Sequence, residues 1–240
     1  MTMTLYILFA MCFLPMILSL ALFFIIPQQK AFWAYLISCA LGIAAVIPAS
    51  FIQFFALKLT LFKSHSFASI LLSAIIFNGL IEEGTKLGAM LLLPRKKLSL
   101  WTFFCSSVLL GMAAGSLETV IYLMTSLQRI ALVSDQNATI RLVFARMFSS
   151  QAIHALCAAL SGLFLWGCKG GIRHAIIVCW AVALHGLFNF FIAFSQEFRL
   201  FAIVAILLAA VECRIWYKII RNSEEISLEE LTQSKEKDTV

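Results

Sequence analysis

The stretch Phe77-Asn78-Gly79-Leu80-Ile81-Glu82-Glu83-Gly84-Thr85-Lys86-Leu87 lies inside an apolar run, residues 67–93, that is long enough to cross a bilayer. Each charged residue near the centre of a membrane helix costs roughly 2.5–3.5 kcal/mol on insertion scales. Two adjacent carboxylates and an ammonium in one helix therefore need compensation from ion pairing, a wet cavity or a catalytic role. A buried salt bridge that ties helices together is the simplest interpretation of this stretch by itself.

The composition predicts an all-α polytopic membrane protein. Of the 240 residues 62% are hydrophobic and 12% are charged, whereas soluble domains are roughly 45–50% apolar. The net charge of +6 is typical of cytoplasmic loops, and no basic face with interleaved aromatic residues indicates nucleic acid. The lipid bilayer is the expected environment. The seven cysteines show no paired spacing, so we interpret them as packing residues rather than as disulfides or a metal cluster.

Seven apolar segments have about spanning length, and we interpret the first as a retained span rather than a signal peptide. They cover residues 5–27, 31–57, 67–93, 99–126, 142–168, 173–194 and 198–220. The sequence therefore predicts one transmembrane domain, 1–221, with its motif-bearing core at about 67–194, and a polar cytoplasmic tail, 222–240. Pro48 predicts a kink or tilt in the second span.

Loop charges predict the orientation of the chain in the membrane. The only dense basic cluster, Arg95-Lys96-Lys97, falls on the same side as Lys30, Lys169, Arg173, Lys218 and Arg221. We therefore expect the N-terminus outside and the C-terminus in the cytoplasm.

Four consecutive spans carry ionisable residues well away from their ends. These residues are Glu82, Glu83 and Lys86 in the third span, Glu118 in the fourth, His154 in the fifth and His185 in the sixth. At about 1.5 Å per residue, they lie roughly 12–22 Å from the outer ends of their spans, so all four spans can contribute to one layer. Taken singly, Glu118 could be the buried partner of Lys86, and His154 could simply form a hydrogen bond to a neighbouring helix. The joint pattern predicts a single polar site between spans 3 and 6.

The spacing within the helices supports convergence. Asn78, Glu82 and Lys86 are four residues apart and share a helix face, so Lys86 can neutralise one carboxylate while another stays free to take a proton from water. His185 and Asn189 are also four apart, as a pair of donors to an oxyanion would be.

Three pairs of small residues predict close helix packing. They are Gly84 with Gly88, Gly111 with Gly115, and Ala158 with Gly162.

At these residues the sequence resembles the PrsW family of intramembrane proteases, which is related to the CAAX prenyl endopeptidases and the Aph subunit of γ-secretase. The family's E-E-x-x-K is present at Glu82–Lys86. The family's second motif is G…F-A-x-x-E-N-x-x-Y. This sequence matches it at Gly111, Glu118 and Tyr122, but has other residues in place of the motif's Phe, Ala and Asn. Arg146 followed by His154, Ala159 and Gly162 matches the third motif, R…H-x-x-x-x-A-x-x-G. The fourth, H-G-x-x-D-F, matches residues 185–190 with Asn189 in place of Asp, and the prenyl endopeptidases use H-x-x-x-N there.

The resemblance implies hydrolysis of peptide bonds in membrane-embedded substrates, either single-span regulators or small membrane peptides, in the bacterial cytoplasmic membrane. Carried over, Glu82 and Glu83 activate water, with Lys86 setting their charge. Between the two, Glu82 is the preferred base, because it lies on the helix face shared with Asn78 and Lys86. His185 and Asn189 bind the oxyanion, and His154 and Glu118 complete the water site or move a proton.

The resemblance leaves the cofactor open, because the family has been described as metalloproteases. A zinc site could use His154, His185 and one or two carboxylates. However, the sequence contains no H-E-x-x-H, and Lys86 puts a positive charge where a dication would sit. We therefore expect a metal-free glutamate protease.

Two further hypotheses come from other functional classes. A non-catalytic scaffold like the Aph subunit should not need the glutamate pair. A proton-coupled transporter predicts inverted repeats and broken helices, and the sequence shows neither.

Overall fold

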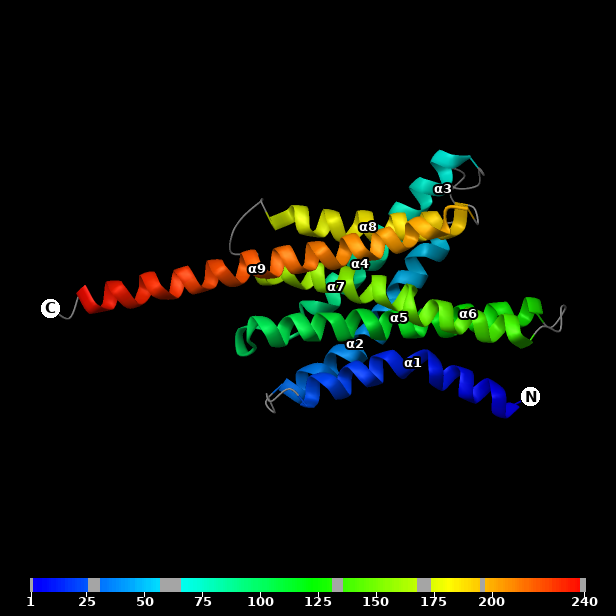
Figure 1. The fold of residues 1–240 in the computed structure, drawn as a ribbon, viewed down its shortest axis with the longest axis horizontal. Coiled ribbons are helices and arrows are strands. Elements are labelled where there is room, and N and C mark those ends of the chain that lie inside the picture. Colours follow the sequence, from blue (N-terminus) through cyan, green and yellow to red (C-terminus); the bar gives the residue numbers. More distant parts are fainter. Residues whose placement is uncertain are drawn as a thin grey trace.

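The computed structural model describes residues 2–25, 31–56, 66–130, 136–167, 174–194 and 197–237, and all regular structure within these ranges is helical. Seven stretches of the described chain are long and apolar enough to cross a membrane, and they match the seven predicted spans. Lys30, Lys169 and Arg173, which the orientation prediction uses, lie outside the described residues. The chain is thus a multi-pass membrane protein, and its described termini lie at opposite ends of the bundle (Figure 1).

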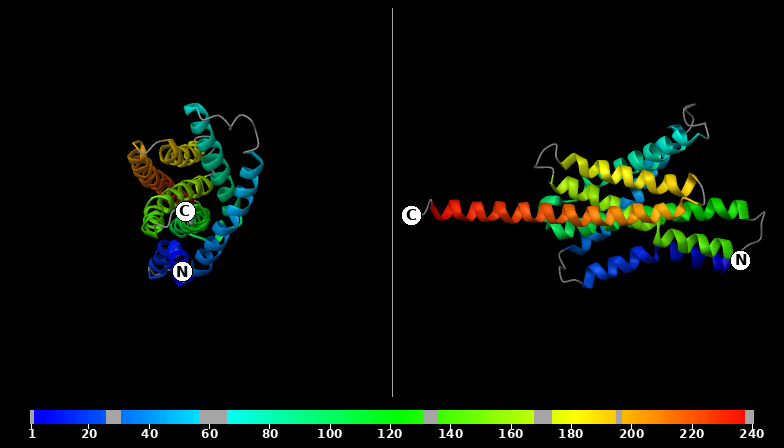
Figure 2. Two further views of the ribbon diagram at one scale, coloured as in Figure 1. Left: turned by 90° about the vertical axis from the view of Figure 1, so that its right-hand side faces the viewer. Right: turned by 45° about the horizontal axis from the view of Figure 1, so that its top comes forward.

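The seven membrane-spanning stretches form one bundle, in which most helices run along its length while α2 and the span made of α3, η3 and α4 cross it obliquely (Figures 1 and 2). Their bounds are α1 Thr2–Ile25, α2 Phe32–Ala56, α3 Phe67–Ser73, η3 Ala74–Ile81, α4 Glu82–Met90, η4 Arg95–Lys97, α5 Leu100–Ile130, α6 Gln136–Phe148, α7 Ser150–Gly167, α8 Ala175–Phe194 and α9 Arg199–Lys237. The last helix, α9, runs without a break through most of the predicted polar tail.

Helices α5 and α7 form the centre of the bundle and share its most extensive interface. Gly111 explains their close approach, because a Cβ atom there would collide with the carbonyl oxygen of His154 and lie 2.6 Å from the Cβ of Ala158. The prediction of close packing is therefore confirmed for this pair of helices. It is wrong for Gly84 and Gly88, which are exposed with no neighbour within 4 Å of an added Cβ, because Glu83 and Lys86 turn the opposite face of α4 inward.

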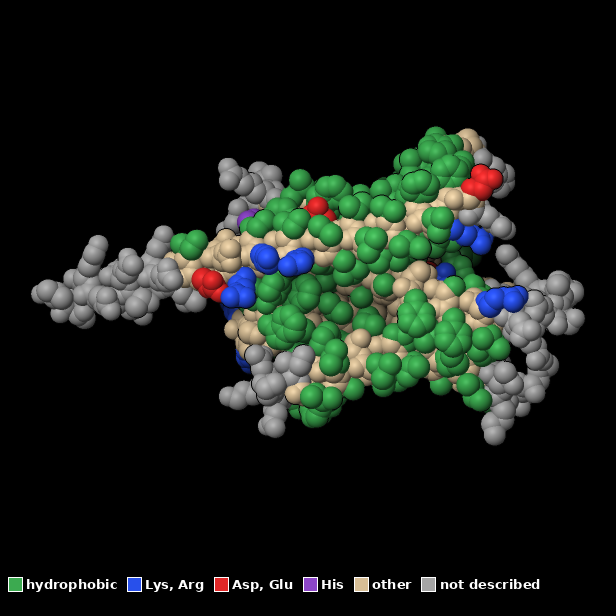
Figure 3. All heavy atoms as spheres, in the orientation of Figure 1, with side chains coloured by type: hydrophobic (Ala, Val, Ile, Leu, Met, Phe, Trp, Pro, Cys, Tyr) green, Lys and Arg blue, Asp and Glu red, His purple; other side chains and the backbone are tan. Residues whose placement is uncertain are grey.

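The outer surface is that of a protein in a hydrocarbon solvent. Apolar side chains cover most of the face in Figure 3, and Lys and Arg gather toward its two ends. Large exposed side chains such as Phe51, Phe54, Trp33 and Leu207 belong to this surface. The six described cysteines are free, and five of them are buried, which agrees with a packing role.

Two departures from regular spans were not predicted. The third span changes from α-helix in α3 to a π-helix in η3 and back in α4, and Ser149 alone separates α6 from α7 within the fifth span. π-Helical turns are rare and occur often at functional sites. The irregular η3 leads directly into the two glutamates that define the site.

Candidate active site

The third span carries its charged residues inward because η3 packs tightly against α8. At Gly79 an added Cβ would run into the carbonyl oxygen of Val182, so only glycine permits this contact. Asn78, Glu82 and Lys86 then line the same cavity, as their spacing predicted.

Glu83 is the fully buried carboxylate of the pair. It accepts from the Lys86 ammonium at 2.7 Å and from His185 Nδ1 at 2.7 Å, both through Oε1. The Ser161 hydroxyl donates to its other oxygen at 3.4 Å. Glu83 thus joins α4, α7 and α8, and it is the carboxylate that Lys86 neutralises.

His154 links Lys86 to the fourth span. Its Nδ1 lies 2.8 Å from the Lys86 ammonium, and its Nε2 contacts Glu118 Oε2. Because an ammonium can only donate, Nδ1 is the acceptor, so a neutral His154 carries its proton on Nε2 and donates to Glu118.

His185 has the opposite arrangement. Its Nδ1 faces the Glu83 carboxylate, so a neutral ring carries its proton there and keeps a lone pair on Nε2. That Nε2 is buried without a hydrogen-bond partner among the described residues. The lone pair faces Glu82 Oε2, 3.7 Å away.

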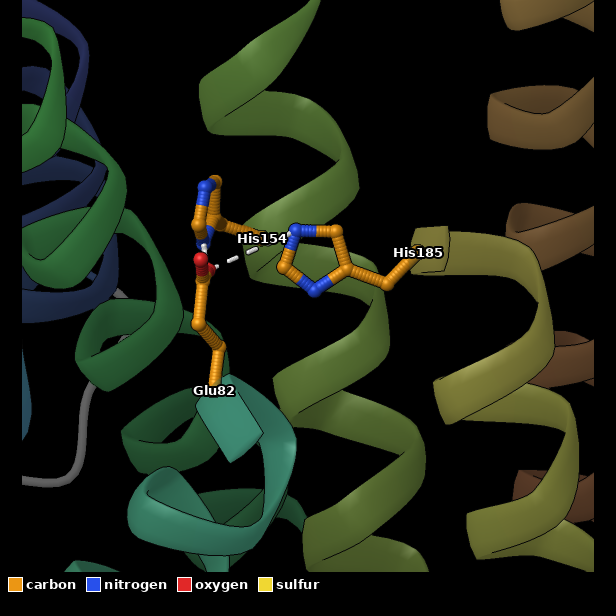
Figure 4. Close-up of side chains that lie close together, drawn as sticks. All are labelled: Glu82, His154 and His185. Atoms are coloured by element: carbon orange, nitrogen blue, oxygen red, sulfur yellow. Dashed lines mark ion pairs between the residues drawn. The ribbon is translucent and has the colours of Figure 1, made fainter. Parts of the chain in front are cut away.

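Glu82 reaches between the two imidazoles, as Figure 4 shows. Its Oε2 lies 3.9 Å from His154 Nδ1 and 3.7 Å from His185 Nε2, and the two rings stand nearly edge to face at 4.6 Å. Its Oε1 accepts from the Gln53 amide at 3.0 Å. Among the described residues, no Lys or Arg forms an ion pair with Glu82, so its Oε2 is free to face a reactant.

Glu118 pairs with Arg146 rather than with Lys86, so the single-residue interpretation of Glu118 as the partner of Lys86 is wrong. The Arg146 guanidinium lies 2.9 Å from Glu118 Oε1, donates to Ser150 Oγ at 3.0 Å, and sits 3.7 Å over the ring of Tyr122. The cluster therefore contains three carboxylates and two basic groups, which are Glu82, Glu83, Glu118, Lys86 and Arg146. If all five are ionised and the histidines are neutral, its net charge is −1.

A cavity of about 150 Å³ lies against the cluster, walled by α2, η3, α4, α5 and α7. Glu82 and Glu118 have side chains 14% and 18% exposed, so the cluster reaches this space and is not sealed in the core. Such a volume has room for water.

Six of the seven predicted site residues lie in one contiguous network: Glu82, Glu83, Lys86, Glu118, His154 and His185. Asn189 does not join it through any described hydrogen bond. Its amide donates to the carbonyl oxygen of His185 in its own helix at 3.2 Å. To bind an oxyanion, this amide would have to leave that carbonyl.

Gln53 of α2 is a site residue that the sequence analysis missed. Its amide donates to Glu82 Oε1 and to the backbone carbonyl of Phe77 in η3, at 3.0 and 2.9 Å. A glutamine inside an otherwise apolar span was the available signal, since polar groups at membrane depth find partners.

Gln53→Leu is expected to lower kcat about tenfold, because Glu82 would lose the donor that fixes its orientation while keeping its chemistry. Gln53→Asn, one methylene shorter, should also fall short of Glu82, and Gln53→Glu should place a repelling charge beside it. The measurement is kcat and KM in proteoliposomes for the three variants. Ser50→Ala, at another residue lining the cavity, is the matched control, and equal losses in it would contradict a positioning role.

Glu82, His154 and His185 also form a possible metal-binding triad, with ligand atoms within 4.8 Å of one another. Two of the three ligands fit, namely Glu82 and His185. His185 Nε2 has a free lone pair, and Glu83 accepts from the other ring nitrogen, as a carboxylate does behind a metal-bound histidine. The third does not, because His154 Nδ1 already accepts from Lys86, whose ammonium would stand beside a dication. In this arrangement the residues do not complete a catalytic zinc site.

The family comparison covers most of the chain. The model of the PrsW family, described as intramembrane metalloproteases, matches residues 30–212. No curated protein and no solved structure gave a significant match. The match includes the six residues of the network formed by Glu82, Glu83, Lys86, Glu118, His154 and His185 (the acid–histidine network) and every residue that lines its cavity. The chain therefore belongs to the PrsW family of intramembrane proteases.

Proposed function

We propose that this protein is an endopeptidase that hydrolyses peptide bonds in membrane-embedded segments, either single-span regulators or small membrane peptides, with water activated by Glu82. One observation carries this proposal: Glu82, which lines the cavity, has its Oε2 3.7 Å from the buried and unpartnered Nε2 of His185. Two acceptors at that separation can each take a hydrogen bond from one water molecule. The lone pairs of that water then remain free to attack a carbonyl carbon.

The chemical step follows from the same contacts. As the water oxygen bonds to the scissile carbonyl carbon, Glu82 takes one of its protons, and the carbonyl π electrons move onto the oxygen. When the tetrahedral intermediate collapses, the C–N bond breaks and Glu82 returns the proton to the leaving nitrogen. Glu83, with Lys86 as its counter-ion, holds His185 in place throughout.

The oxyanion is assigned to His185 and Asn189, as the family resemblance implies. The contacts add a condition: while the ring is neutral, His185 Nε2 accepts from the attacking water, so it can donate to the oxyanion only after it has taken up a proton of its own and both ring nitrogens carry protons. Glu83, which lies 2.7 Å from Nδ1, stabilises that charged ring. His154 and Glu118 form the opposite wall and relay protons to or from Lys86.

We also propose that the reaction needs no metal. The support is the Lys86 ammonium, which occupies the lone pair of His154 that a zinc ion would need. The predicted orientation, with the N-terminus outside and the C-terminus in the cytoplasm of a bacterial cell, belongs to the same proposal.

A cleavage assay in proteoliposomes tests both proposals. Purified protein is mixed with a panel of single-span substrates, and products are identified by mass spectrometry, with and without a membrane-permeant chelator. We expect cleavage inside or next to the spans, the same rate with chelator, and no stoichiometric metal by elemental analysis.

Activity that a chelator removes and zinc restores would contradict the metal-free mechanism while leaving the protease function standing. Lack of cleavage of every panel member by folded protein would contradict the function itself. Lys86→Met adds a second measurement: if zinc then binds stoichiometrically to the variant but not to the wild type, the ammonium is what keeps the metal out.

A further inference from the structure

A groove of about 590 Å³ lies between α5 and α9, at the end of the bundle where η4 leads into α5. Its apolar wall includes Trp101 and Phe104 of α5 and Leu156 of α7, and its rim is formed by Arg214, Lys218 and Arg221 of α9. It shares no residue with the cavity beside the acid–histidine network. The groove therefore has to be explained separately from the proposed reaction.

The groove exists because α5 and α9 both pack against α7 but hardly against each other. They meet through aromatic rings at one level: Tyr217 stands 6.1 Å from Trp101 and 5.2 Å from Phe104, measured between ring centroids. In a protein that spans a bilayer, an apolar cleft of this kind between two helices is filled by hydrocarbon.

The rim is positively charged and follows one face of α9. Arg214, Lys218 and Arg221 are four and three residues apart, so their side chains lie above one another. All three are exposed; Arg221 is paired with Glu225 at 2.8 Å, and no described ion pair involves Arg214 or Lys218. None of the described lining residues is acidic. In Figure 3, Lys and Arg side chains on α9 border the hollow between α9 and the helices beside it.

The depth of the rim agrees with a headgroup position. Trp101 is the second residue of α5 and follows the basic segment Arg95–Lys97, and Trp and Tyr gather at membrane–water interfaces. Tyr217 contacts Trp101, so the neighbouring Lys218 lies at the same level and Arg214 one turn deeper. Long basic side chains at such a level extend toward the interface.

We propose that this groove binds an anionic phospholipid, with an acyl chain against Trp101, Phe104 and Leu156 and the phosphate on Arg214 and Lys218. The volume lies within the roughly 300–1,000 Å³ of ligand pockets. Basic pockets between membrane helices suit anionic headgroups. A zwitterionic lipid gains less there, because its own ammonium faces the same cations. The bound lipid fills the space between α5 and α9.

Fluorescence quenching tests the proposal on purified protein in detergent. Phosphatidylglycerol or phosphatidylcholine with brominated acyl chains is titrated into the protein, and quenching of tryptophan fluorescence is measured. The part of the quenching that is lost in Trp101→Phe measures binding in the groove. We expect phosphatidylglycerol to quench Trp101 at lower concentrations than phosphatidylcholine does. The double variant Arg214→Gln/Lys218→Gln should bind phosphatidylglycerol about thirtyfold more weakly, which corresponds to roughly 2 kcal/mol.

The matched control is Lys96→Gln/Lys97→Gln, which removes the same charge at the same end of the bundle but outside the groove. Its affinity should stay within about threefold of the wild type. An equal loss in both double variants would show attraction to surface charge alone and overturn the proposal. Equal quenching by the two lipids in the wild type would overturn the headgroup assignment.

Discussion

Glu82→Gln is expected to lower kcat for cleavage of a membrane-embedded substrate about a thousandfold while the protein stays folded. The amide cannot take a proton from water, yet its carbonyl oxygen still accepts the hydrogen bond from Gln53 that the wild-type Oε1 accepts. No described Lys or Arg depends on Glu82 for a counter-ion, so the substitution strands no buried cation. Initial rates in proteoliposomes and thermal unfolding midpoints measure the two effects separately.

The matched control for this variant is Glu225→Gln, which makes the same chemical change at an exposed carboxylate on α9. Its rate should equal that of the wild type. If Glu82→Gln also cleaves at the wild-type rate, Glu82 is not the base. If it loses activity and unfolds many degrees earlier than the wild type, Glu82 has a structural role that the contacts do not predict.

Glu83→Gln is expected to lower both stability and activity, which distinguishes it from Glu82→Gln. Glu83 and Lys86 are 0% and 3% exposed and 2.7 Å apart, so removing the carboxylate leaves a buried ammonium without its counter-ion. Breaking a buried pair from one side costs about 3–5 kcal/mol. For a chain of this size, that is a fall of roughly 6–20 °C in the unfolding midpoint, measured in the same detergent or liposomes.

The double variant Glu83→Gln/Lys86→Met completes the test. With both charges gone, no buried ion is left unpaired, so most of the lost stability should return. Activity should not return, because His185 still lacks the carboxylate that holds its ring and stabilises its charged form. Additive losses of stability in the double variant would contradict the pairing, and recovery of activity would contradict the role of Glu83 behind His185.

Together these two predictions divide the labour of the adjacent acids. Spacing in the sequence put Glu82 on the face shared with Asn78 and Lys86 and made it the preferred base. The contacts support the same choice for another reason: Lys86 neutralises Glu83, and Glu82 keeps an oxygen free toward both imidazoles.

The sequence by itself determined the membrane class, the seven spans and the layer in which Glu82, Glu118, His154 and His185 meet. These follow from one-dimensional quantities, because apolar length must match bilayer thickness and ionisable groups at membrane depth must converge to be tolerated. The four motifs indicated the family for the same reason, since their residues and order can be read along the chain.

Only the tertiary structure decided which groups pair. Whether Lys86 neutralises Glu82 or Glu83, whether Glu118 meets Lys86 or Arg146, and whether Gln53 reaches the site all depend on how each helix is rotated about its axis. That rotation is set by contacts between helices, such as Gly79 on Val182 and Gly111 on His154, and by the π-helical turn of η3. Equal spacing at Gly84 and Gly88 produced no such contact, because a small residue permits close approach only where a neighbouring helix is present to make it.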